Sequence, residues 1–114
     1  MTKTRLKRIE RRIERIKSEL VKIEAMRPGS LTKQYKDPHK QLGSYYQLSY
    51  TLEMRSRTEY IRNDYVRDIR RQVKLYKRYK QLNVDWVSLS IEHSKLAMKL
   101  KSDELLTKYP MENL

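Results

Sequence analysis

Arginine, lysine, tyrosine and glutamine are the side chains of this sequence that could carry chemistry, and many of them gather between residues 43 and 78. Arg and Lys contact phosphate oxygens, whereas Gln, Ser and Arg can hydrogen-bond to base edges. A β-ribbon that carries tyrosines among cations can lie in a nucleic-acid groove. We therefore expect contacts with nucleic acid, in the first place duplex DNA, at Gln47, Ser49, Arg55, Arg57, Arg62, Arg67, Arg70, Arg71, Lys74, Lys77 and Arg78.

The basic charge is unevenly distributed. The 27 Lys and Arg exceed the 14 Asp and Glu, which gives a net charge of +13. Residues 1–82 carry +14 and residues 83–114 carry −1. A basic region of this kind predicts a polyanionic partner, whose phosphates the Arg and Lys of the first predicted helix would also contact. The alternative is that these charges only solvate exposed helices.

The residue types that enzymes need are scarce. The chain contains no cysteine and two glycines, so it has neither a thiolate nor a glycine-rich phosphate loop. Asp64 and Asp68 are better interpreted as a helix cap and a salt-bridge partner than as metal ligands. His39 and His93 each stand alone, which favours an ordinary loop residue and a packed or partner-facing residue. We expect no catalytic residue, no cofactor and no metal.

Apolar residues are few. They make up 38% of the chain, which is thin for a compact core and favours an elongated helical protein or an oligomer. No apolar run approaches the roughly 20 residues that a membrane-spanning helix needs. The lack of cysteine suits the cytoplasm. We expect a cytoplasmic protein with no membrane partner.

The segment 44–62 predicts a β-hairpin. Alternation of apolar and polar residues indicates two strands, and the link over 52–56 lacks the Asn-Gly of a two-residue turn, so a longer loop is expected. A two-stranded ribbon is marginal alone, so one face must pack on a helix. The side chains expected on that face are Tyr46, Leu48, Tyr50 and Tyr60. The other face and the loop would present Gln47, Ser49, Thr51, Arg55 and Arg57.

Two segments carry the heptad spacing of a coiled-coil seam. Apolar residues recur in steps of 3 and 4 within 2–26, and a second seam lies within 63–104, which is either one helix or two with a break at 82–85. A seam this narrow needs a partner helix, from the same chain or from a second copy. We expect a homodimer whose interface comprises Leu6, Ile9, Ile13, Ile16, Leu20, Ile23, Leu82, Trp86, Leu89, His93, Leu96 and Leu100.

Together these segments predict a single domain that is mostly α with one β-hairpin. A coiled-coil-like helix over 2–26 leads through a loop at 27–43 to the two-stranded ribbon of 44–62. A long helix, or two helices, follows over 63–104, and 105–114 forms a frayed tail.

Three short motifs occur in a specific order. They are Arg-Pro-Gly-Ser-Leu at 27–31, Gly-Ser-Tyr-Tyr-Gln-Leu-Ser-Tyr at 43–50 and Arg-Thr-Glu-Tyr-Ile-Arg at 57–62. Over residues 26–97 the chain resembles a family of small bacterial and archaeal proteins of unknown function, often encountered with transposase and other mobile-element genes. The resemblance implies a mobile-element, plasmid or virus context and no established activity. Members often carry a cysteine cluster that could bind metal; residues 35–40 hold none here, so that role is not carried over.

Two functions follow as expectations. The first is a non-enzymatic, basic DNA-binding protein that dimerises through its helical seams. The second is a coiled-coil interaction module that docks onto a transposase or replication protein without binding nucleic acid itself. An inhibitor that acts by direct contact with a nucleic-acid-binding protein is a third interpretation.

Overall fold

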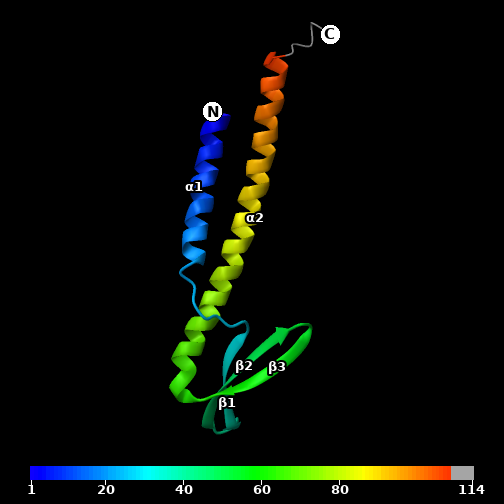
Figure 1. Ribbon diagram of the computed structural model, residues 1–114. Coiled ribbons are helices and arrows are strands. Elements are labelled where there is room, and N and C mark those ends of the chain that lie inside the picture. Colours follow the sequence, from blue (N-terminus) through cyan, green and yellow to red (C-terminus); the bar gives the residue numbers. More distant parts are fainter. Residues whose placement is uncertain (109–114) are drawn as a thin grey trace. The chain divides into compact units, whose positions relative to one another are not determined.

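The chain folds into two helices and one small antiparallel sheet (Figure 1). A computed structural model describes residues 1–108. As predicted, the fold is mostly α with a β-hairpin, an N-terminal helix and a long C-terminal helix. The elements are α1 (Thr2–Leu20), β1 (Ser30–Asp37), β2 (Leu42–Leu52), β3 (Arg55–Ile61), a short 3-10 helix (Asn63–Tyr65) and α2 (Val66–Lys108).

The elements form two compact units. The helical unit joins residues 1–22 to the chain from Gln81 onward, and the sheet unit comprises Ile23–Lys80. Helix α2 contributes its first part to the sheet unit and its remainder to the helical unit. Whether the chain behaves as the single domain expected from its length stays a prediction.

In the helical unit, α1 runs antiparallel to the second part of α2 (Figure 1). Ile9 and Ile16 of α1 are buried, as are Leu82 and Leu89 of α2. These four residues come from the two predicted seams, so each seam has a partner helix within the same chain. Burial of apolar seams is the main source of stability for such helices, because isolated helices of this length are marginal in water.

Polar contacts at the rim of the helical unit agree with this antiparallel pairing. An Arg5 guanidinium nitrogen lies 3.0 Å from a Glu92 carboxylate oxygen, and Nε2 of His93 lies 3.0 Å from Oε1 of Glu10. The Lys17 ammonium lies 5.5 Å from the centre of the Trp86 ring. His93 is therefore a packed residue that faces α1.

The sheet has the strand order β1-β2-β3, and both pairs are antiparallel. Leu48, at the centre of β2, is fully buried and lies opposite Leu31 on one side and Glu59 on the other. It packs in one cluster with Ile61 of β3 and with Val66 and Val73 of α2. The core of the sheet unit therefore lies between one face of the sheet and the first turns of α2.

The loop predicted over 27–43 contains a strand, and this prediction was wrong. Ser30–Asp37 forms β1 and pairs with β2. The sheet therefore has three strands, whereas a two-stranded hairpin would be only marginally stable alone. The lysines of this segment made it resemble a loop. They occur in a strand because β1 lies at the sheet edge, where Lys33 and Lys36 are exposed to solvent. Pro38, which lacks the N–H that a ladder requires, follows the last strand residue.

The helix bounds also differ from the prediction. α1 ends at Leu20 instead of residue 26, and its last turn is closed by hydrogen bonds from the Val21 and Lys22 N–H groups to carbonyl oxygens of α1. α2 is one helix and has no break at 82–85. Residues 105–108, predicted to fray, are helical, and the remainder of the predicted tail lies outside the described residues.

The turn between β2 and β3 is shorter than predicted. Leu52 pairs with Arg55, so only Glu53 and Met54 form the turn. Both have positive φ, 53° and 65°, as the two central residues of a type I′ turn require. Non-glycine residues in this conformation cost about 1–2 kcal/mol each, which is why Asn-Gly is the usual sequence signal and why its absence misled the prediction.

Tyr60 is the one predicted core residue of the hairpin that lies on the wrong face. The strand register places it opposite Gln47, on the open face of the sheet, where it is 66% exposed. Its neighbour Ile61 occupies the core position instead. Tyr46 and Tyr50 pack against the core as predicted. The register decides this outcome, because a shift of one residue reverses every side chain of a strand.

We predict that Gly29→Ala destabilises the sheet unit. Gly29 has a φ of 122°, and a Cβ there would lie 2.5 Å from the Ser49 carbonyl oxygen. Backbone strain and steric overlap should together lower the free energy of unfolding by about 2 kcal/mol or more, measured by urea denaturation. Gly43→Ala is the control: its φ of 70° is reachable by other residues and its neighbours are side-chain atoms of Lys36, so a smaller loss is expected. Equal losses would contradict this account.

Candidate nucleic-acid interface

Three side chains join the separate segments of the sheet unit. The Arg27 guanidinium donates two hydrogen bonds to the Glu59 carboxylate, at 2.8 and 2.9 Å, and the Tyr50 hydroxyl donates a third at 2.8 Å. The guanidinium also lies 5.2 Å from the centre of the Tyr50 ring. The Arg27 backbone N–H donates to the Gln72 carbonyl oxygen of α2 at 3.1 Å. This network fixes the chain before β1 to β2, β3 and α2, and so holds the scaffold on which the candidate interface lies.

Hydrogen bonding shifts the ionisation of this pair. The bonds from Arg27 and then Tyr50 lower the pKa of the Glu59 carboxyl, since they stabilise its charged form. The bond to Glu59 raises the pKa of Arg27. Both groups are therefore charged at neutral pH, and the pair is one component of the stability of the sheet unit.

One face of the first turns of α2 is cationic. Arg67, Arg70, Arg71 and Lys74 recur at intervals of three or four residues, which places them on one side of a helix. All four are exposed, and together with Asn63 and Val66 they line an open groove of about 470 Å³. The positive end of the helix dipole lies at the same turns. We call these four residues the cationic stripe.

The stripe is poorly neutralised. Only Arg71 has an acidic neighbour, Asp68, at 3.8 Å. Within residues 1–108, Arg67, Arg70 and Lys74 make no ion pair, and neither does Lys77 in the next turn. The whole sheet unit holds 14 Lys and Arg against 6 Asp and Glu, a net charge of +8. An anion could approach this face without displacing a strong internal partner.

The open face of the sheet is mainly polar, with one cation, Lys36, at the end of β1. Gln47 and Ser49, predicted to contact bases, lie on it together with Tyr60 and Thr58, as the register requires. Ser49 and Thr58 hydroxyls lie 3.4 Å apart, and the Tyr45 and Tyr60 rings are 6.2 Å apart. These hydroxyl and amide groups can both donate and accept hydrogen bonds.

Two of the arginines predicted to contact DNA, Arg55 and Arg57, do not lie on this open face. Arg57 lies opposite Tyr50 and Arg55 opposite Leu52, so both belong to the face of β3 that also carries Glu59. Arg57 was predicted on the face of Gln47 and Arg55 in the loop; both predictions were wrong, because the turn has only two residues and sets a different register. Arg62, just before α2, lies 3.6 Å from Asp64. Lys77 and Arg78 extend the basic part of α2 beyond the stripe.

Four of the twelve residues of the predicted oligomer interface are buried inside the chain. Ile9, Ile16, Leu82 and Leu89 are buried within the helical unit, so we no longer assign them to contacts with a second copy. The other predicted interface residues are half-buried: Leu6, Ile13, Leu20, Ile23, Trp86, His93, Leu96 and Leu100. Whether the protein dimerises stays a prediction, and a dimer that keeps this fold would use surface that is not buried within the chain.

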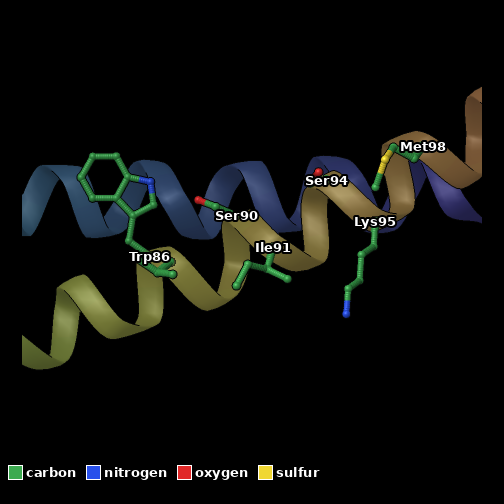
Figure 2. A pocket seen from close by; sticks show the side chains of 7 residues that line it. Trp86, Ser90, Ile91, Ser94, Lys95 and Met98 are labelled. Carbon is green, nitrogen blue, oxygen red and sulfur yellow. The ribbon is translucent and has the colours of Figure 1, made fainter.

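Such a surface lies on the outer side of α2. Val84, Val87, Ile91 and Met98 are each more than half exposed, and their steps of 3, 4 and 7 place them in one row, the outer seam. A cavity of about 470 Å³ follows this row and is also lined by Trp86, Ser90, Ser94 and Lys95 (Figure 2). Val84, Val87, Ile91 and Met98 were not among the predicted interface residues, although their heptad spacing was the available signal.

The described residues form neither a metal-binding cluster nor a membrane-spanning helix. Over residues 1–108, no three His, Asp or Glu side chains gather closely enough to hold a metal ion. His39, in the turn after β1, is exposed. Neither described helix combines the length and the apolar character needed to cross a bilayer.

The fold and the candidate site define a small basic protein in which one helix serves both a helical pair and a three-stranded sheet. Residues 6–71, more than half of the chain, match the family described as Domain of unknown function (DUF6788), and the chain belongs to that family. Searches among curated proteins and among solved structures found no match. The family membership agrees with the resemblance to a family of unknown function; the association with mobile elements stays a prediction.

We predict that Glu59→Gln lowers the free energy of unfolding at pH 7 by about 1 kcal/mol, because it removes a charged acceptor that is still partly exposed. Since the folded pKa of Glu59 is below its unfolded value, the wild-type advantage is complete above about pH 5 and is lost as the pH falls through the folded pKa. Urea denaturation from pH 7 to pH 3 measures this. Glu53→Gln, in the exposed turn, is the control and should change stability little at any pH; a pH-independent effect of Glu59→Gln would contradict the prediction.

Proposed function

We propose that this protein is a non-enzymatic DNA-binding protein whose sheet unit contacts duplex DNA through the cationic stripe. The observation that supports this most is the set of exposed cations on one helix face, lining a groove, with a single weak acidic neighbour. From Arg67 to Lys74 the helix rises about 10 Å, a length over which duplex DNA carries about six phosphate charges. The stripe can therefore contact several phosphates at once.

The polar groups of the sheet complement this electrostatic contact. Phosphate contacts position a protein on DNA, whereas selectivity requires hydrogen-bonding groups that reach base edges. Gln47 and Ser49 on the open face are the candidates for that role, and a β-ribbon fits a groove of the duplex. The stripe supplies affinity in this proposal, and the sheet supplies whatever selectivity there is.

Basic charge alone does not favour the stripe over α1. Residues 1–22 hold nine Lys and Arg against three Glu, so α1 is also strongly basic. The difference is that the stripe lines a groove in the same unit as hydrogen-bonding strands. A role in a mobile element, plasmid or virus belongs to the same proposal, and rests on the motif resemblance.

We predict that Arg67→Gln, Arg70→Gln and Lys74→Gln together weaken binding to a short duplex at least tenfold at low salt. Each neutralised phosphate contact should reduce the slope of log affinity against log salt by about 0.9, so the slope should fall by about 2.7. Fluorescence anisotropy over a salt series measures both quantities.

The matched control carries Arg8→Gln, Arg12→Gln and Arg15→Gln, which remove the same charge from exposed positions of α1. We expect this control to weaken binding by threefold or less. Equal losses in the two variants would indicate unspecific attraction to net charge, and salt-insensitive or absent binding of the wild type would overturn the proposal.

A second candidate function is self-association through the outer seam. The seam is apolar and exposed, whereas the outer side of α1 is charged, so a second copy of α2 is the surface of this chain that matches it. Isologous pairing of identical patches is the commonest route to a dimer. This candidate also covers the alternative of a helical module that docks onto a transposase or replication protein without binding nucleic acid itself.

Ile91→Glu tests the outer seam. We expect a dimer for the wild type and a monomer for this variant by light scattering at equal concentration, because a buried unpaired carboxylate is costly. Ser18→Glu adds the same charge to an exposed position of α1, away from the outer seam, and should leave the dimer intact. A monomeric wild type over the micromolar range would exclude self-association, and the seam would then be left for another protein.

A further inference from the structure

The β2–β3 hairpin continues beyond the sheet as an arm. Ser30 of β1 pairs with Ser49, which is the last β1–β2 pair at that end, whereas β2 and β3 stay paired up to Leu52 and Arg55. Every residue from Thr51 to Thr58 is exposed. Figure 1 shows the hairpin extending past the end of β1. We call residues 51–57 the arm.

The tip of the arm is apolar, exposed and strained. Met54 is 99% exposed and Leu52 is 51% exposed. Met54 and Glu53 both hold the left-handed conformation, which glycine or asparagine would adopt with less strain. The backbone conformation of Met54 serves the two-residue turn, whereas its side chain is fully in solvent and adds nothing to the folded core. Strain kept at an exposed position is a reason to look for a role outside the fold.

The two faces of the arm differ in chemistry. Leu52, Arg55 and Arg57 lie on one face, and Thr51 and Ser56 lie on the other. An apolar tip with arginines behind it matches a duplex, where apolar side chains enter between base pairs and cations contact the flanking phosphates. A bilayer is the poorer match, because one methionine and one leucine bury little apolar area. The cationic stripe, in the same unit, points to the same polyanion.

We propose that the arm is a DNA wedge: the Met54 side chain inserts at a base-pair step and kinks the duplex, while Arg55 and Arg57 contact phosphates beside it. This proposal rests on the proposed DNA-binding function and adds its mode. Unstacking is least costly at flexible pyrimidine–purine steps. The arm should therefore favour duplexes that contain a TA or CA step over an A-tract of the same length. Glu53 is the one carboxylate of the arm, and its charge opposes close approach to phosphate.

The experiment measures bending separately from binding. A 30-base-pair duplex with a central TA step carries a fluorophore at each end and, in a second version, 2-aminopurine at the step. We expect the wild type to raise end-to-end energy transfer and to brighten 2-aminopurine, as a kinked and unstacked step requires. Met54→Gly should lose both signals yet bind within threefold of the wild type, because the stripe is intact.

The Met54→Gly variant distinguishes a side chain that bends DNA from one that is needed only for folding. Gly relieves the left-handed strain, so Met54→Gly should unfold at a higher temperature than the wild type while losing the bend. Met54→Leu keeps an apolar side chain and should retain both signals. Glu53→Gln should retain the bend and bind slightly more tightly.

The outcomes distinguish the two proposals. Binding with an unchanged bend in Met54→Gly, or binding with no bend in the wild type, would overturn the wedge and leave DNA binding by the stripe in place. No binding of the wild type to duplex DNA at low salt would overturn both.

Discussion

The ion pair between Arg27 and Glu59 is the interaction that joins the separate segments of the sheet unit. It connects the chain before β1 to β3, and through the Tyr50 hydroxyl and the Gln72 carbonyl it reaches β2 and α2 as well. Bidentate geometry makes such a pair directional as well as attractive. With Arg27 fixed, the chain passes close over β2, where only glycine fits at position 29. β1 can then pair with β2 and complete the sheet.

Helix α2 serves both units through different faces. Val66, Ile69 and Val73 pack on the sheet, whereas Leu82 and Leu89 pack beside α1. The two apolar rows of α2 therefore have different partners, and the helix needs no break at 82–85 to serve both. Because each row covers only one side of the helix, the remaining sides are free to carry the cationic stripe in one unit and the outer seam in the other.

These arrangements divide the proposed tasks between the units. The sheet unit carries a net charge of +8, the hydrogen-bonding strands and the arm, which are the parts that a nucleic acid could contact. The helical unit carries the exposed apolar row that another helix could cover. Electrostatic attraction to phosphate and burial of apolar surface respond oppositely to salt, so the two tasks can be measured separately.

The sequence by itself determined the helices, the hairpin and the basic region, since heptad spacing, period-two alternation and charge are local properties. It also identified Leu48 as a core residue and the need of a seam for a partner helix. Only the tertiary structure decided which seam residues face each other, because a seam pairs equally well with a helix of the same chain or of a second copy. The tertiary structure also decided that residues 30–37 form a strand, because an edge strand is stabilised by pairing with its neighbour more than by its own residues. The faces of Tyr60, Arg55 and Arg57 followed from strand register, which a two-residue turn of Glu53 and Met54 sets and which no local signal announced.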